Sequence, residues 1–219
     1  EVADLVAAHR RQGAEATRHR SAVDDPAVFG VVDLAEDGRI LRFVEKPAPG
    51  TEPSNLVNAG TYVFEPTMLE RIPAGRPASI ERDVFPVVSS DQRLYGVVTD
   101  DYWIAAGRPE LYRAANLDLL GERRRHDRTE PLADGARVAS DATVQNSLVG
   151  TGARVDSGAT VVDSVLLPGA HVGAGASVYD SLVMGEVGVR ARLSHCTVGA
   201  TGVVPEGAVL DGTSLPAPE

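Results

Sequence analysis

The pattern of apolar and polar positions changes its period near residue 121. Before that point, short apolar runs of strand character alternate with stretches of helical spacing. The spacing predicts helices over 1–11, 66–71, 79–88 and 109–120, and strands over 27–34, 39–45, 57–64 and 94–99. Asp37-Gly38, between two of these strands, is typical of a hairpin turn. The first part, residues 1–121, is therefore predicted to be an α/β domain.

The later part of the chain is repetitive. Small and β-branched residues recur about every sixth position, and whole blocks recur every 17 residues. The repeated positions include Val138, Val155, Val172 and Val189, and also Ser147, Ser164 and Ser181. Such hexapeptide repeats predict a left-handed parallel β-helix over 135–214, joined to the first domain by a linker over 122–134. We expect its fourth coil to run from Val189 and its fifth to start near Val204.

Composition narrows the class of protein. The formal net charge is −10 and the acidic and basic residues are interspersed, so we expect neither a nucleic-acid partner nor an anionic-membrane partner. The one cysteine, Cys196, excludes an internal disulfide and fits a reducing compartment. No run is long and apolar enough to span a membrane, and no signal peptide is recognisable. These features predict a cytoplasmic protein.

The candidate chemistry lies in the segment Phe43-Val44-Glu45-Lys46-Pro47. Lys46 is the one lysine among 21 basic side chains, and the others are arginines. A compact ammonium suits a single phosphate oxygen, whereas the planar guanidinium binds as a fork. Glu45 beside it could hold a sugar hydroxyl. Together, the carboxylate and the ammonium predict a site for a sugar phosphate. The alternative is a solvated ion pair at a strand end, worth under about 1 kcal/mol.

Two further positions have the character of a binding site. In Asn58-Ala59-Gly60, an amide that donates and accepts stands beside a glycine that lets a ligand approach the backbone. Gly30 is a second such glycine, inside a predicted strand. The alternatives are a turn or strand-edge amide for Asn58, and a twist or bulge in the strand for Gly30.

Four motifs follow one another along the first part. They are Phe43 to Pro47, Asn58 to Phe64, Ser79 to Pro86 and Tyr102 to Pro109. With the hexapeptide repeats after them, the chain resembles the sugar-1-phosphate nucleotidyltransferases over nearly its whole length, most of all the mannose-1-phosphate guanylyltransferase type. The resemblance implies a partial Rossmann-like domain and transfer of a nucleotidyl group from an NTP (GTP) to a sugar-1-phosphate (mannose-1-phosphate). Such transfer is assisted by Mg²⁺, releases pyrophosphate, and depends mainly on positioning and charge neutralisation.

The same resemblance assigns roles to the candidate residues. It implies that Glu45 holds hydroxyls of the sugar ring, that Lys46 holds its phosphate, and that Asn58 contacts the sugar. Gly60 would give the ligand access to the backbone, and Gly30 would lie near the ring.

Two departures from the family pattern limit these expectations. The chain has no glycine-rich G-x-G-T-R-L loop for the nucleotide phosphates and no early Asn-Gly-Asp for the metal. In Trp103-x-Ala105-x-Gly107, an alanine stands where the family carries its second metal carboxylate, and a methyl group cannot coordinate Mg²⁺. Asp100 and Asp101 are near in sequence, but nothing in the pattern places them at a metal. We expect that the chain is a piece of a longer or processed protein, and that it has no transferase activity alone.

Two alternatives remain at this point. The chain could be a non-catalytic family member that binds a sugar phosphate or serves as an oligomerisation or regulatory subunit; Ala105 favours this, whereas Glu45 and Lys46 favour an enzyme. The other alternative is a hexapeptide acyltransferase with His171 or His195 as its base, although both histidines lie within the repeat register. In either case, the repeated small apolar side chains predict self-association through the β-helix.

Overall fold

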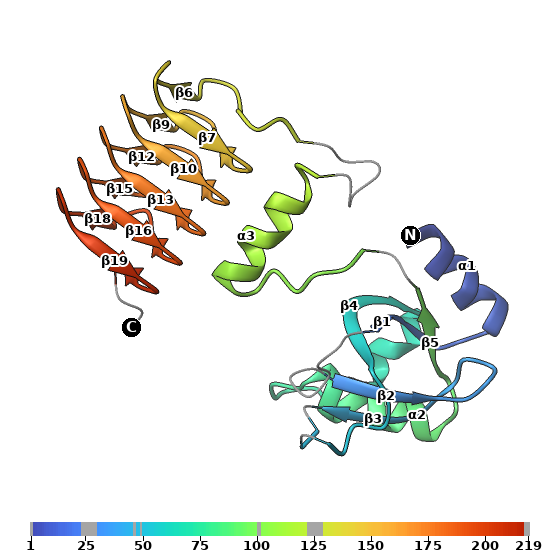
Figure 1. The fold of residues 1–219 in the computed structure, drawn as a ribbon. Coiled ribbons are helices and arrows are strands. Elements are labelled where there is room, and N and C mark those ends of the chain that lie inside the picture. Colours follow the sequence, from blue (N-terminus) through green and yellow to red (C-terminus); the bar gives the residue numbers. More distant parts are fainter. Residues whose placement is uncertain are drawn as a thin grey trace. The chain divides into compact units, whose positions relative to one another are not determined.

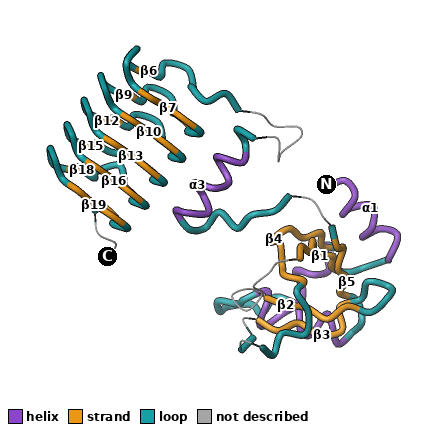
Figure 2. Tube along the Cα trace, viewed as in Figure 1, coloured by secondary structure: helices purple, strands orange, loops and turns teal. Residues whose placement is uncertain are grey.

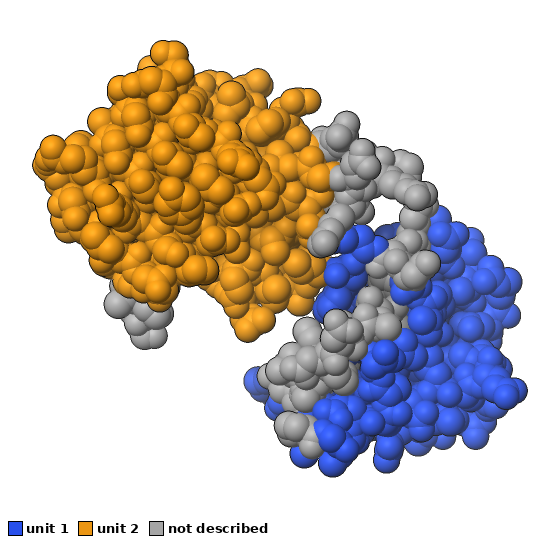
Figure 3. Space-filling model, viewed as in Figure 1, with its two compact units in different colours: residues 1–103 blue, residues 104–219 orange. Residues whose placement is uncertain are grey.

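The computed structural model describes residues 2–22, 30–45, 47–48, 50–99, 102–121 and 129–216. Contacts divide the chain into two compact units, Glu1–Trp103 and Ile104–Glu219, which Figure 3 shows in different colours. Within the described ranges, no helix combines the length and the apolar character needed to cross a membrane.

The first unit is built on a mixed β-sheet (Figure 1). Among the described residues, the order of its strands is β3-β2-β4-β1-β5. The strands are β1 (Ala16–Ala22), β2 (Gly30–Leu34), β3 (Ile40–Glu45), β4 (Leu56–Phe64) and β5 (Leu94–Val98). β1 and β5 pair in parallel, and the other neighbours pair antiparallel. The predicted hairpin is confirmed, because Gly38 in the turn between β2 and β3 has a φ of 85°. β1 was not predicted.

Short helices pack against this sheet and complete its core. They are α1 (Val2–Gln12), the 3₁₀-helix η1 (Pro66–Arg71), the π-helix η2 (Ile80–Val84) and α2 (Phe85–Ser90). The predicted helix over 79–88 therefore consists of a π-helical turn followed by an α-helix. Pro86 stands in the first turn of α2 and has no N–H, so it cannot donate the α-helical hydrogen bond to the residue four positions earlier. Phe85 and Val88 of α2 are fully buried with Val32 and Leu94 of the sheet.

The second unit contains the parallel β-helix that the hexapeptide repeats predict (Figure 2). In the part of the chain that the structure describes, each coil adds short strands to three parallel sheets. One sheet holds β6 (Arg137–Val138), β9 (Arg154–Val155), β12 (His171–Val172), β15 (Glu186–Val187) and β18 (Val203–Val204). The next holds β7 (Thr143–Gln145), β10 (Thr160–Val162), β13 (Ser177–Tyr179), β16 (Arg192–Ser194) and β19 (Val209–Asp211). The third holds β8 (Leu148–Val149), β11 (Val165–Leu166), β14 (Leu182–Val183), β17 (Thr197–Val198) and β20 (Ser214–Leu215).

The 17-residue step is interrupted once. The first valines of the repeat pair in successive strands as predicted, but Val172 then pairs with Val187 and not with Val189. The prediction that the fourth coil runs from Val189 was wrong. The fifth coil does pass through Val204, which pairs with Val187.

A shorter corner causes this interruption. Between β14 and β15 stand Met184 and Gly185 alone, whereas residues 167–170 separate β11 from β12. The tight corner brings backbone close to Gly185, where a Cβ atom would lie 2.1 Å from the carbonyl oxygen of Gly202. A glycine at this position is therefore a steric requirement of the short coil.

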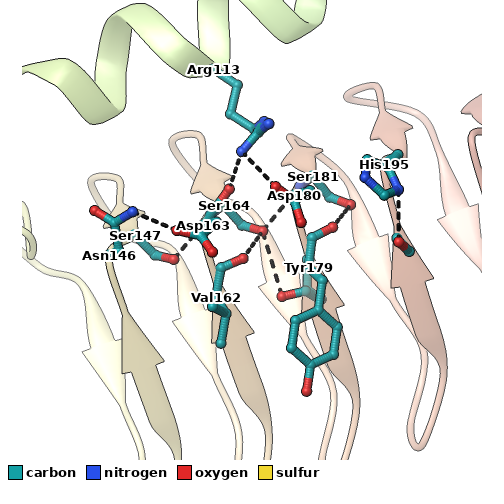
Figure 4. Close-up of polar contacts among 12 residues, drawn as sticks. Arg113, Asn146, Ser147, Val162, Asp163, Ser164, Tyr179, Asp180, Ser181 and His195 are labelled. Atoms are coloured by element: carbon teal, nitrogen blue, oxygen red, sulfur yellow. Dashed lines mark hydrogen bonds and ion pairs between the residues drawn. The ribbon is translucent and has the colours of Figure 1, made fainter.

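Buried hydroxyl groups form a ladder along the β-helix (Figure 4). The Oγ atoms of Ser147, Ser164 and Ser181 each accept the backbone N–H of the equivalent residue in the next coil, at 3.0 Å. Each hydroxyl also donates to the carbonyl two residues earlier in its own coil. Cys196 is the next rung of this ladder. The serines that repeat in the sequence thus satisfy backbone amides that the turns leave inside the protein.

The residue before each rung adopts a left-handed backbone conformation. Asn146, Asp163, Asp180 and His195 have φ angles between 43° and 53°. Asn, Asp and His tolerate this region better than most residues other than glycine, which explains why these types recur at the corner.

One helix of the second unit packs on the outside of the β-helix. α3 (Pro109–Asp118) begins at the predicted proline and contacts β11 and β14. Leu166 and Val183 point into the core of the β-helix, so Val165 and Leu182 beside them point outwards. Val165 and Leu182 are nevertheless buried, because α3 covers β11 and β14. Arg113 of α3 donates to the carbonyl of Asp163 and lies 3.3 Å from the carboxylate of Asp180 (Figure 4). Contacts therefore group α3 with the β-helix, while the expected domain boundary at residue 121 stays a prediction.

Candidate functional site

Three of the predicted site residues stand on one row across the sheet of the first unit. Gly30 on β2 pairs with Glu45 on β3. Because Val31 pairs with Val57 of β4 in an antiparallel register, Gly30 also stands level with Asn58. Neighbouring strands are about 4.8 Å apart, so Glu45 and Asn58 are about 10 Å apart with a residue between them that has no side chain. Between the two polar positions, the row therefore consists of backbone alone.

The structure describes only part of the pair formed by Glu45 and its neighbour Lys46. The structure describes the backbone of Glu45 and Gly30, but the side chain of Glu45 lies outside the described atoms. Lys46 lies outside the described residues altogether. Their assigned roles therefore stay predictions, supported by the position of Glu45 at the end of β3.

Asn58 and Gly60 belong to a bulge in β4. Arg18 of β1 pairs with Tyr62 and Arg20 with Asn58, so one residue of β1 faces three residues of β4. Within the bulge, Gly60 is exposed with a φ of 75°. Its N–H donates to the side-chain oxygen of Asn58 at 3.2 Å. Gly60 therefore has a conformational reason to be glycine, in addition to the predicted access of a ligand to its backbone.

A chain of hydrogen bonds leads from Asn58 into the protein. The Nδ2 atom of Asn58 donates to the hydroxyl of Tyr62 at 2.6 Å, and this hydroxyl donates to Oε1 of Glu81 at 3.1 Å. Oε2 of the same carboxylate accepts the hydroxyl proton of Ser79 at 3.1 Å. Tyr62 and Glu81 were not singled out from the sequence. Both fall within the motifs quoted above, and the even spacing of Asn58 and Tyr62 along a strand was the available signal.

Aromatic packing holds Tyr62 in place. Its ring stacks on Phe64 at 5.5 Å and meets Phe85 edge-on at 5.4 Å between centroids. The guanidinium carbon of Arg18 lies 4.0 Å from the centroid of Phe85 and 5.4 Å from that of Tyr62. Because Arg18 and Phe85 are fully buried, the cation and the rings form one packed layer beneath the hydrogen-bond chain.

The turn that carries Glu81 is anchored by its own backbone. The N–H of Ser79 donates to Oδ2 of Asp83 at 2.7 Å, and the N–H of Arg82 donates to Oγ of Ser79 at 3.3 Å. The bond from Ser79 is the main reason why the pKa of Asp83 is lowered, with Arg76 contributing through its charge. Asp83 therefore stays ionised at neutral pH and fixes the start of η2 next to the candidate site.

The family motif that contains Ala105 begins at the same bulge. Nε1 of Trp103 donates to the carbonyl of Ala59 at 3.0 Å. Trp103 is partly buried, and its ring nitrogen donates to the backbone of β4. Ala105 follows in a turn in which its carbonyl accepts the N–H of Gly107 at 2.8 Å.

The residues present do not fit the Mg²⁺ that the resemblance implies. The side chain of Ala105 offers no oxygen at the position of the family's carboxylate. Among the residues that the structure describes, no cluster of three or more His, Cys, Asp or Glu side chains could hold a metal ion. Asp100 and Asp101 lie outside the described residues. We therefore derive no step through a metal.

Each of the two histidines of the β-helix lies beside an aspartate carboxylate. Nε2 of His171 lies 2.7 Å from Oδ2 of Asp156. Nδ1 of His195 lies 3.2 Å from Oδ1 of Asp211 and 2.8 Å from the hydroxyl of Ser194. His195 is also one of the left-handed corner residues. Both positions therefore have a structural explanation within the coil.

Comparison with known proteins agrees with the fold and the motifs. Residues 1–122 match the family model described as Nucleotidyl transferase, and residues 119–194 and 136–213 match the model of the GlmU-like, C-terminal hexapeptide. The chain is 37% identical over 146 residues to a probable mannose-1-phosphate guanylyltransferase 2 of Oryza sativa subsp. japonica, an alignment that covers 66% of the chain and 39% of that protein. It is 38% identical over 122 residues to a mannose-1-phosphate guanylyltransferase of Mycobacterium tuberculosis, covering 55% of the chain and 33% of that protein. The chain thus spans well under half the length of these relatives. Since the first family model covers more than half of the chain, the protein belongs to the nucleotidyl transferase family.

Proposed function

We propose that the intact protein acts in the transfer of a guanylyl group from GTP to mannose-1-phosphate. The observation that carries the proposal is the row formed by Glu45, Gly30 and Asn58, in which two polar residues flank a strand position without a side chain. The names of the relatives supply the substrate, because they are mannose-1-phosphate guanylyltransferases. A strand position without a side chain, between a carboxylate and an amide, suits the edge of a sugar ring, whose hydroxyls both donate and accept.

In the proposed reaction, an oxygen of the sugar phosphate attacks the α-phosphorus of the nucleotide. A new phosphorus–oxygen bond forms, and the bond from the α-phosphorus to the bridging oxygen of pyrophosphate breaks. Glu45 and Asn58 would orient the sugar through its hydroxyls, and the ammonium of Lys46 would hold the attacking phosphate and reduce its charge. These residues contribute positioning and neutralisation, which are the main requirements of phosphoryl-type transfer.

Assembly and location are parts of the same proposal. The family binds a sugar phosphate and an NTP, and the hexapeptide β-helix fits oligomerisation. We propose that the protein is a homo-oligomer held together by its β-helix, and that it works in the cytoplasm, where a lone reduced cysteine is usual.

Binding of mannose-1-phosphate to the 219-residue chain, measured by titration calorimetry, tests the proposal. Lys46→Met should weaken binding at least tenfold, and Lys46→Arg less, because a fork replaces a point charge. Arg10→Met, which removes an exposed cation from α1, is the matched control and should leave the affinity unchanged. No saturable binding of any sugar-1-phosphate to the wild-type chain would refute the proposal. The sequence holds no glycine-rich loop, and position 105 has an alanine in place of a carboxylate. The same chain should therefore release no pyrophosphate from GTP.

A further inference from the structure

The hydrogen bonds that lead from Asn58 have only one consistent direction. A backbone N–H can only donate, so the side-chain atom of Asn58 that faces the N–H of Gly60 must be its oxygen. Its Nδ2 atom therefore faces Tyr62, whose hydroxyl must accept this bond. The proton of that hydroxyl is then directed to Glu81. Each step follows from the one before it, without any choice between amide nitrogen and oxygen.

A second path reaches Glu81 from the opposite side. The N–H of Arg82 donates to the hydroxyl oxygen of Ser79, whose proton goes to the other carboxylate oxygen of Glu81. The two hydroxyl groups therefore donate one hydrogen bond to each oxygen of the Glu81 carboxylate. Glu81 is thus the common end point of two paths that begin at backbone amides.

The described partners use only part of the hydrogen-bonding capacity of the Asn58 amide. The bond to Tyr62 uses one of the two hydrogens on Nδ2, and the bond from Gly60 uses one of the two lone pairs on Oδ1. Among the residues that the structure describes, none takes the second N–H or the second lone pair of this half-buried side chain. A sugar hydroxyl, which donates and accepts, matches this pair.

We propose that Glu81 is a positioning residue for the sugar-phosphate site, which orients the Asn58 amide through the hydroxyl of Tyr62. The inference rests on the proposed function, because it takes Asn58 as a ligand-binding residue. Without an acceptor at position 81, the hydroxyl proton of Tyr62 can turn towards Asn58. The amide then either loses its bond to Tyr62 or rotates, which places Nδ2 against the N–H of Gly60. In both cases the N–H offered to the ligand is misplaced.

Binding of mannose-1-phosphate to the 219-residue chain provides the first test. Glu81→Met, which removes the acceptor and keeps the length of the side chain, should weaken binding about tenfold. Glu81→Gln should stay within about threefold of the wild type, because its amide oxygen can still accept from Tyr62. Glu70→Met, at an exposed position of the same unit, is the matched control and should have no effect.

A double-mutant cycle separates positioning from a general loss of structure. If Glu81 acts through Asn58, then Glu81→Met should cause no further loss of affinity in an Asn58→Ala background. Equal losses in both backgrounds would show that the effect is not transmitted by Asn58, and would overturn the inference.

The side-chain amide of Asn58 gives a readout that needs no ligand. Its NH₂ resonances in a ¹⁵N-labelled chain are assigned by their loss in Asn58→Ala. They should shift, and exchange faster with water, in Glu81→Met and in Tyr62→Phe, but not in Glu70→Met. Unchanged resonances in Glu81→Met would overturn the inference. If the wild type bound no sugar-1-phosphate, the proposed function and the ligand-facing part of the inference would both fail, while these resonances would still decide the orientation.

Discussion

Removal of one hydroxyl from the serine ladder should destabilise the β-helix far more than its size suggests. The side chain of Ser164 is fully buried. Its Oγ accepts the N–H of Ser181 at 3.0 Å and donates to the carbonyl of Val162 at 2.7 Å. In Ser164→Ala, the carbonyl of Val162 keeps a bond from the N–H of Asp180. The N–H of Ser181 loses its partner inside the protein, which is the larger cost.

The magnitude follows from these contacts. An orphaned buried N–H costs about 1–3 kcal/mol, and the lost hydroxyl-to-carbonyl bond adds about 1 kcal/mol. We therefore expect Ser164→Ala to lower the free energy of unfolding of the β-helix by about 2–4 kcal/mol. Ser157→Ala removes an exposed hydroxyl from the same coil, one that bonds to Asp141, and should change stability by less than about 0.5 kcal/mol. Ser164→Cys should lie between the two, because a thiol, as at Cys196, donates and accepts weakly.

Urea unfolding followed by circular dichroism measures this change in the whole chain. With a slope of about 2 kcal/mol per molar urea, the expected loss moves the midpoint by about 1–2 M. The single tryptophan, Trp103, belongs to the first unit, so its fluorescence should keep its midpoint. A loss below about 0.5 kcal/mol at an unchanged slope would refute the reasoning. An equal shift of the Trp103 transition would show that the ladder is not the cause.

Other variants test separate features. Gly185→Ala should cost about 3 kcal/mol or more, since its Cβ would lie 2.1 Å from the carbonyl oxygen of Gly202; Gly107→Ala, with no atom within 4 Å, should be nearly neutral in the same urea experiment. Arg113→Met should speed amide hydrogen exchange in α3 without affecting β11 and β14, and Arg113→Lys should restore part of the protection. Unchanged exchange in Arg113→Met would contradict the idea that Arg113 holds α3 against the β-helix. The hydrogen bonds from Arg71 lower the pKa of Glu15 below its ordinary 4.5. A carboxyl of this kind stabilises the fold above its unfolded pKa, and the contribution is lost as the pH falls through the folded pKa. The midpoint reported by Trp103 should therefore fall on acidification below about pH 4.5, and Glu15→Gln should flatten that decline; an identical acid dependence in both proteins would argue against it.

The hydrogen-bond chain at the candidate site shows what a sequence reading can and cannot find. Asn58 was found because an amide beside a glycine has recognisable chemistry. Tyr62 and Glu81 are as well placed, but they are 19 residues apart, and only the packing of η2 against β4 joins them. The spacing of apolar residues carries no information about such a contact, since a hydrogen bond between distant residues depends on how the elements pack.

The same distinction applies to the fold. β1 contains alanine, arginines and a histidine and has little strand character of its own. It is a strand because it pairs with β4 on one side and β5 on the other, so that its backbone groups are satisfied by neighbours. The shortened fourth coil was missed for a related reason. The valine at position 189 continued the spacing of the repeat, while the corner at Gly185 had already removed two residues from the coil.

By itself, the sequence determined the β-helix, the α/β character of the first part and the position of the candidate motifs, because these depend on repeats and turns that are encoded locally. Tertiary structure alone decided that Gly30 stands between Glu45 and Asn58, that β4 bulges at Gly60, and that Glu81 accepts the hydrogen bond of the Tyr62 hydroxyl. Each of these depends on the register between strands or on packing between separate elements. Register is set by the sum of many weak contacts, which no short segment of the chain contains.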